Sequence, residues 1–225
     1  MMATSISEPA ISPIRAVMLD YGEVLCFLPT PDAIARMARI FRIDPGAFLS
    51  IYTQSRGPYD RGDLSPEEYW HAFASQAGVT LDGDLIEELR RWDVEMWSRT
   101  NDPMILWLES LHAAGLKTAI LSNMPSDMVE HLRRNSPWMK NFDHQIFSAE
   151  VRRIKPEPAI YEHSLHALKL PLQRFCSSTT VMQISNKLAR TECEAFDSSV
   201  HQLRDDLHAL GFHVLPPRIN SHHNL

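Results

Sequence analysis

Three polar residues, far apart in the sequence, carry side chains suited to phosphoryl transfer. Asp20 and Ser122 each follow a short apolar run, and Lys155 stands before a predicted helix. A carboxylate can attack phosphorus and form an aspartyl phosphate, a hydroxyl can hold a phosphoryl oxygen, and a lysine can neutralise both nucleophile and phosphate. Taken singly, Asp20 is as typical of a strand-end cap, Ser122 of a turn and Lys155 of a solvated surface charge.

The apolar runs before these residues predict buried parallel strands. Residues Ile14–Leu19 and Lys117–Leu121 are short, mostly apolar and end in polar residues, and a further strand is expected near Gln145–Ser148. Amphipathic segments after them predict helices over residues 126–134 and 158–168. Such alternation is typical of an α/β fold with a doubly wound parallel sheet, in which ligands bind beyond the carboxyl ends of the strands.

Between the first two strands, the apolar spacing changes to that of helices. Breaks fall at Asp44-Pro45, at Gly57-Pro58 and between Gly78 and Gly83, which predicts an inserted bundle of four helices. The tryptophans of this segment, at helical spacing, are expected to pack in the bundle core. The predicted domains are a core of residues 14–25 and 98–217, a helical cap of residues 26–97, and tails of residues 1–13 and 218–225.

Composition excludes several classes of function. The 225 residues are 44% apolar with a formal charge of −6, so the chain has no basic footprint for nucleic acid. It has no apolar run of the roughly 20 residues that span a bilayer, and residues 1–13 lack the pattern of a signal peptide. The three cysteines have no metal-ligand spacing. We expect a cytoplasmic protein that binds neither nucleic acid nor membrane.

Considered together, three segments resemble a known family. Ala16–Leu25, Ile120–Asn123 and Lys155–Tyr161, the last reading Lys-Pro-Glu-Pro-Ala-Ile-Tyr, are similar to the haloacid dehalogenase superfamily of hydrolases. The order, the spacing and the helical cap after the first strand resemble its subfamily IA, most closely the branch of the epoxide-hydrolase N-terminal phosphatase domain. The resemblance implies a Rossmann-like core and a Mg²⁺-dependent phosphatase that acts on a small phosphorylated metabolite through an aspartyl phosphate.

The resemblance also implies roles for individual residues. Asp20 would be the nucleophile and a metal ligand, the backbone carbonyl of Gly22 a second metal ligand, Ser122 a contact to phosphate, Lys155 the charge anchor, and Asn123 a substrate contact.

The cap is expected to add substrate contacts. Arg56, Tyr59 and Arg61 are predicted to lie in a cap loop before Gly62, where they are candidates for binding substrate; a solvated loop is the alternative.

The sequence departs from the family at the position of its general acid and base. The family's second aspartate is replaced by Gly22, as in some members of the epoxide-hydrolase branch. Glu23 is an alternative acid, although adjacent side chains point in different directions. Tyr21 follows Asp20 directly, which disfavours the carbon–halogen chemistry of the dehalogenases proper.

A larger departure concerns the metal ligands. The family has an Asp-Asp pair between Leu172 and Phe196, where this chain has no acidic residue before Glu192. We therefore expect weakened Mg²⁺ binding and weak or absent phosphatase activity. A hypothesis is that residues 175–197 are translated in a shifted frame, because the alternative frame permits Asp-Asp, asparagine and glycine in the family's order. The nucleotide sequence tests this. The alternative function is a catalytically inactive binding or regulatory protein, or a damaged gene product.

Overall fold

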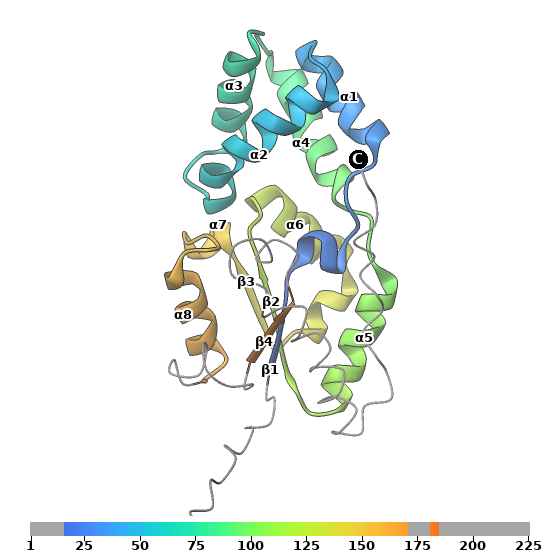
Figure 1. The fold of residues 1–225 in the computed structure, drawn as a ribbon, viewed down its shortest axis with the longest axis vertical. Coiled ribbons are helices and arrows are strands. Elements are labelled where there is room, and N and C mark those ends of the chain that lie inside the picture. Colours follow the sequence, from blue (N-terminus) through green and yellow to red (C-terminus); the bar gives the residue numbers. More distant parts are fainter. Residues whose placement is uncertain (1–15, 171–180, 185–225) are drawn as a thin grey trace, which may run out of the picture.

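The computed structural model describes residues 16–170 and the backbone of residues 181–184. Predictions for the two tails, for a helix from Val200 and for a strand from Phe212 lie outside the described residues. So does the shifted-frame segment, apart from one short strand. Figure 1 shows two layers, a group of helices above a parallel sheet that has helices on both of its faces.

The sheet confirms the predicted parallel α/β core. Its strands are β1 (Ala16–Leu19), β2 (Lys117–Ser122), β3 (His144–Phe147) and β4 (Val181–Ile184). All pairs are parallel, in the order β3-β2-β1-β4. Leu19 lies opposite Ile120 on one side and Ile184 on the other, so the ends of three strands meet at one edge. Side chains alternate between the two faces of the strands, and both faces are buried.

Four helices and two short helical turns surround this sheet. They are η1 (Tyr21–Leu25), α5 (Asp102–Ala113), α6 (Ser126–Asn135), η2 (Pro137–Asn141), α7 (Ser148–Val151) and α8 (Pro158–Ala167). The segments that lead to and from the cap pair at an antiparallel bridge between Cys26 and Thr100. No helix in the described part of the chain is long and apolar enough to cross a membrane.

The cap consists of four helices, and each begins at a capping residue that directly precedes it in the sequence. They are α1 (Pro31–Phe41), α2 (Pro45–Arg61), α3 (Pro66–Ala77) and α4 (Gly83–Met96). The residues before them, Thr30, Asp44, Ser65 and Asp82, each accept a backbone N–H of the first turn, which satisfies donors that a helix leaves open. The predicted packing of Trp70 is confirmed, since it is fully buried among cap aromatics.

The predicted break at Gly57-Pro58 is wrong. Helix α2 continues through both residues to Arg61, although Pro58 lacks a backbone donor. Contacts on each side of Pro58 favour the continuous helix: Arg56 pairs with Asp60 one turn later, and Tyr59 stacks on a ring of α3. Tertiary packing thus overrides the local cost of the proline.

Candidate active site

Asp20 lies directly after β1, at the carboxyl edge of the sheet. The residue is 8% exposed. Its Oδ1 accepts the backbone N–H of Tyr21 at 2.8 Å and the hydroxyl of Ser122 at 2.8 Å. Ser122 is the last residue of β2. Because β1 and β2 are neighbours, two residues separated by about a hundred positions meet through the register of the sheet.

Lys155 reaches the same carboxylate from the loop between α7 and α8. Its Nζ lies 2.6 Å from Asp20 Oδ2 and donates to the carbonyl of Leu121 at 3.0 Å. Both side chains are mostly buried, at 9% exposure for Lys155 and 11% for Asp20. The structure therefore brings the three predicted catalytic residues together around one carboxylate, with the lysine as counter-charge.

Asn123 holds the backbone of Lys155. The side-chain oxygen of Asn123 accepts the Lys155 N–H at 2.8 Å, and its amide nitrogen donates to the Lys155 carbonyl at 3.0 Å. This two-way clamp joins the end of β2 to the lysine loop. In this structure Asn123 acts as a positioning residue, while its predicted contact to substrate stays a prediction.

Gly22 lies in the turn η1, under the indole of Trp97. Its φ of −61° is open to any residue, and a Cβ built on it would lie 3.9 Å from the Trp97 ring, an ordinary contact. The glycine is therefore not required by backbone geometry at this position. The hydroxyl of Tyr21 donates to the Trp97 carbonyl at 2.7 Å, which ties the turn to the end of the cap. Burial raises the pKa of the nearby Cys26 thiol to about 12, so this thiol is protonated and unreactive at neutral pH.

The residues present do not fit a complete Mg²⁺ site. Mg²⁺ prefers octahedral coordination by oxygen, and the predicted ligands here are the Asp20 carboxylate and the Gly22 carbonyl. Among the residues that the structure describes, no three His, Cys, Asp or Glu side chains come together as a metal site. One oxygen of Asp20 already contacts Lys155. The expected Mg²⁺ cofactor thus lacks a donor set in this part of the chain.

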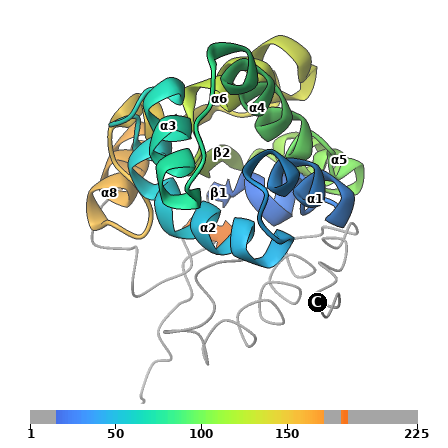
Figure 2. The same cartoon turned by 90° about the horizontal axis from the view of Figure 1, so that it is seen from above.

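The cap is seated on the carboxyl edge of the sheet. The Ser148 hydroxyl, just after β3, donates to the carbonyl of Asp60 and accepts the N–H of Met124 at 3.0 Å. Gly62, with a φ of +82°, approaches so closely that a Cβ would lie 2.9 Å from the Ala149 carbonyl. Figure 2, which looks down on the cap, shows the ends of β1 and β2 at the centre of the ring of helices.

Ion pairs reinforce this seating. Arg90 of α4 binds both carboxylate oxygens of Asp127 on α6, at 2.8 and 2.9 Å. Arg61 at the end of α2 pairs with Glu157 of the Lys155 loop. Arg152 donates to the carbonyl of Gly62. Arg61 was a candidate for binding substrate from the sequence, and the structure gives it a protein partner at the junction of cap and core.

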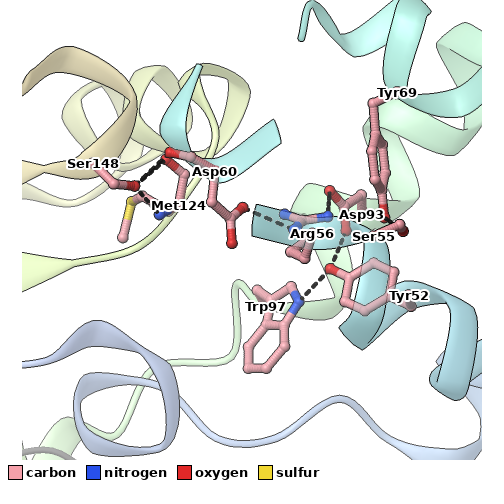
Figure 3. Close-up of polar contacts among 9 residues, drawn as sticks. All are labelled: Tyr52, Ser55, Arg56, Asp60, Tyr69, Asp93, Trp97, Met124 and Ser148. Carbon is pink, nitrogen blue, oxygen red and sulfur yellow. Dashed lines mark hydrogen bonds and ion pairs between the residues drawn. The ribbon is translucent and has the colours of Figure 1, made fainter. Parts of the chain in front are cut away.

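Arg56 and Tyr59 lie on helix α2 and not in a loop, which corrects their predicted location. Arg56 Nε lies 2.9 Å from Asp60 and Nη1 lies 2.8 Å from Asp93. Its guanidinium also packs on the rings of three tyrosines, 4.7 to 5.6 Å from their centroids, namely Tyr52, Tyr59 and Tyr69. The predicted loop fails because these contacts bury the segment, as Figure 3 shows for the polar groups.

This polar network extends to Trp97, whose indole lies against Gly22. Asp93, only 3% exposed, accepts the Tyr52 hydroxyl at 2.6 Å, and that hydroxyl accepts Trp97 Nε1 at 3.0 Å. Burial disfavours the charged form of Arg56, but Asp93, Tyr52 and Asp60 together favour it more, so the pKa of Arg56 is above its ordinary value. Arg56 therefore stays charged and paired with the carboxylates of Asp60 and Asp93.

Sequence reasoning missed Asp60 and Asp93. Asp60 could have been found from its spacing of four residues after Arg56 on a helix, had the helix been predicted through Pro58. Asp93 had no such signal, because it lies on α4 and meets Arg56 only through the packing of the cap.

The ion pair between Arg61 and Glu157 is expected to help to hold the cap on the core. A double-mutant cycle with Arg61→Gln and Glu157→Gln should show a coupling of about 0.5 kcal/mol in the free energy of unfolding, because the pair is half-exposed and screened. Urea unfolding measures it. The exposed pair Arg91–Glu88, which lies within α4, is the control and should couple less. A coupling no larger than the control's would show that this pair does not hold the cap.

Comparisons with known proteins agree with this architecture. The family model of the haloacid dehalogenase-like hydrolases matches residues 53–176, more than half of the chain. A search of curated proteins finds no match.

Solved structures share the fold at low identity. A HAD family enzyme from Bacteroides thetaiotaomicron aligns with a TM-score of 0.65 and 15% identity, over 93% of this chain and 96% of that one. A predicted HAD-like family hydrolase from Porphyromonas gingivalis aligns with a TM-score of 0.62 and 16% identity, over 93% and 94%. The Bacteroides enzyme in complex with magnesium and inorganic phosphate aligns at 0.61 and 15%, over 81% and 99%. With a matching family model, a parallel core and a helical cap, the chain belongs to the haloacid dehalogenase-like hydrolases.

Proposed function

We propose that this chain is a phosphomonoester hydrolase that acts on a small phosphorylated metabolite through an aspartyl phosphate. The observation that carries the proposal is the Asp20 carboxylate between the Ser122 hydroxyl and the Lys155 ammonium, at 2.8 and 2.6 Å. A buried carboxylate with a cation and a hydroxyl donor beside it matches the needs of a nucleophile that meets a phosphoryl group. The Bacteroides enzyme's complex with inorganic phosphate supports this class of ligand.

In the proposed reaction, an oxygen of Asp20 attacks phosphorus as the bond from phosphorus to the leaving oxygen breaks. Ser122 turns its hydroxyl from Asp20 to a phosphoryl oxygen, and Lys155 balances the charge of nucleophile and phosphate. Asn123 keeps Lys155 in place through its backbone. Water then attacks the phosphorus of the aspartyl phosphate, which releases phosphate and restores the carboxylate. Because no metal site fits the described residues, no step here depends on Mg²⁺.

A second candidate is a non-catalytic member of the family that binds a ligand or regulates a partner. The poor donor set around Asp20 and the lack of acidic residues from 172 to 191 favour it. Dehalogenation is less favoured, because Tyr21 follows Asp20 directly.

Titration calorimetry separates the two candidates. We expect Mg²⁺ to bind with a dissociation constant of about 1 mM or weaker, since few oxygen ligands surround it. Beryllofluoride, which mimics a phosphoryl group on a carboxylate, should bind the wild type in excess Mg²⁺ but not the Asp20→Asn variant. Asp63→Asn, a change at an exposed carboxylate of the cap, is the control and should bind as the wild type does. Absence of heat with both ligands would favour the non-catalytic candidate.

A further inference from the structure

One buried hydroxyl, that of Ser148, contacts two other segments of the chain. Ser148 is fully buried and directly follows β3. Its Oγ accepts the backbone N–H of Met124 at 3.0 Å and donates to the backbone carbonyl of Asp60, contacts that Figure 3 draws as dashed lines. The carbonyl of Met124, at 3.4 Å, is the more distant of its two acceptors. Because a hydroxyl carries one proton, Ser148 donates to the cap and accepts from the core.

On the cap side, this contact completes the end of helix α2. The last carbonyls of an α-helix have no partner within the helix. The carbonyl of Asp60 is one of these, and it accepts the Ser148 hydroxyl. Just beyond, a Cβ on Gly62 would lie only 2.9 Å from the carbonyl of Ala149. The end of α2 therefore rests directly on the backbone that follows β3.

On the core side, Met124 belongs to the segment that carries two residues of the proposed site. It follows Ser122, whose hydroxyl donates to Asp20 at 2.8 Å, and Asn123. The Asn123 side chain binds both the N–H and the carbonyl of Lys155, at 2.8 and 3.0 Å. A hydrogen bond to the N–H of Met124 therefore restrains the backbone on which both contacts depend.

We propose that Ser148 is a positioning residue, whose hydroxyl couples the seating of the cap to the placement of Lys155 beside Asp20. This inference rests on the proposed function, because it gives Ser148 a part in the same reaction. Removal of the hydroxyl takes a partner from a buried acceptor, the carbonyl of Asp60, and from a buried donor, the N–H of Met124. The segment after β2 is then less restrained, and Lys155 is placed less accurately for charge balance in the transition state.

Hydrogen exchange of single amides, followed by NMR, tests the coupling without turnover. In Ser148→Ala, the Met124 amide loses its acceptor and should exchange faster for that reason alone. The amide of Lys155 keeps its acceptor on Asn123, and we expect it to exchange about tenfold faster because the loop is less restrained. Ser164→Ala is the matched control: Ser164 is equally buried, but its hydroxyl donates to a carbonyl of its own helix, α8, at 2.7 Å. The control should leave the Lys155 amide unchanged.

Gly62→Ala tests the cap side of the coupling. The added Cβ meets the carbonyl of Ala149 at a φ of +82°, so the end of α2 cannot seat as it does in the wild type. Exchange at Lys155 should rise in this variant too. The double variant with Ser148→Ala should exchange about as fast as Ser148→Ala alone, because the path from the cap is already broken.

The kinetics of phosphate release give a second measurement. Ser148→Ala should lower kcat about tenfold and change KM less than about threefold, because charge balance matters most in the transition state. A merely structural role would instead raise exchange of the β1 amides as much as that of Lys155. Ser148→Cys keeps a weaker donor and acceptor at similar size, so both effects should be intermediate, and it replaces Ser148→Ala if that variant does not fold.

Three results would overturn the inference. They are a Lys155 amide that exchanges no faster than the β1 amides do in Ser148→Ala, additive effects of Gly62→Ala and Ser148→Ala on that exchange, and an unchanged kcat in Ser148→Ala. Absence of phosphate release by the wild type would contradict the proposed function, and the exchange rates would still decide whether Ser148 couples the cap to the Lys155 loop.

Discussion

Replacing Asp20 by asparagine is expected to reduce hydrolysis of a generic phosphomonoester by at least about a thousandfold. The amide keeps the shape of the side chain but is a poor nucleophile, so the aspartyl phosphate does not form. It also removes the charge that Lys155 Nζ faces at 2.6 Å. Release of inorganic phosphate, measured at high enzyme concentration so that slow turnover is detected, gives the ratio of the two rates.

Glu23→Gln is the matched control for Asp20→Asn. Glu23 lies three residues further on in the turn η1, at a φ of 64°, and is the alternative acid considered from the sequence. Its substitution should change the rate less than about threefold if Glu23 has no part in proton transfer. Equal phosphate release by the wild type and the Asp20→Asn variant would contradict the nucleophilic role of Asp20. A large loss in Glu23→Gln would assign it the general acid.

Replacing Lys155 by methionine is expected to lower the free energy of unfolding by about 3 kcal/mol. Methionine retains the apolar stem, but the ammonium is lost and Asp20 keeps an uncompensated charge at 11% exposure. The carbonyl of Leu121 also loses a donor. Urea unfolding monitored by tryptophan fluorescence measures the loss.

A double-mutant cycle then assigns this loss to the ion pair. Asp20→Asn combined with Lys155→Met removes both charges, so the double variant should lose about 2 kcal/mol less than the sum of the single variants. Lys140→Met, at an exposed lysine, should change stability by less than about 0.5 kcal/mol. Additive single effects would show that the two charges do not stabilise each other.

Much of the core was predictable because its signals are local. Buried parallel strands read as short apolar runs, and polar residues at their ends identified Asp20 and Ser122. The helix ends were equally local: Ser65 and Glu68 form a capping box, with the Glu68 carboxylate on the Ser65 N–H at 2.8 Å. These features depend on residues a few positions apart.

The path of α2 was not predictable in the same way. Gly57 and Pro58 favour a break by their backbone preferences, and no residue nearby signals otherwise. Arg56 finds one carboxylate four residues later and another on α4, thirty-seven residues away, and that second contact exists only once the cap is packed. The predicted location of Arg56 and Tyr59 in a loop was therefore wrong, while their predicted contact with substrate stays a prediction.

The sequence by itself determined the parallel α/β class, the helical insertion and the three residues around which the chemistry is proposed. These features could be predicted because strand patterns, and the polar residues at the ends of strands, depend only on short segments of sequence. Only the tertiary structure decided that these three residues meet at one carboxylate, that Asn123 clamps Lys155 and that the cap contacts the end of β3 through Asp60 and Ser148. Contacts between residues tens of positions apart depend on strand register and on the seating of the cap, and neither is encoded in a local pattern.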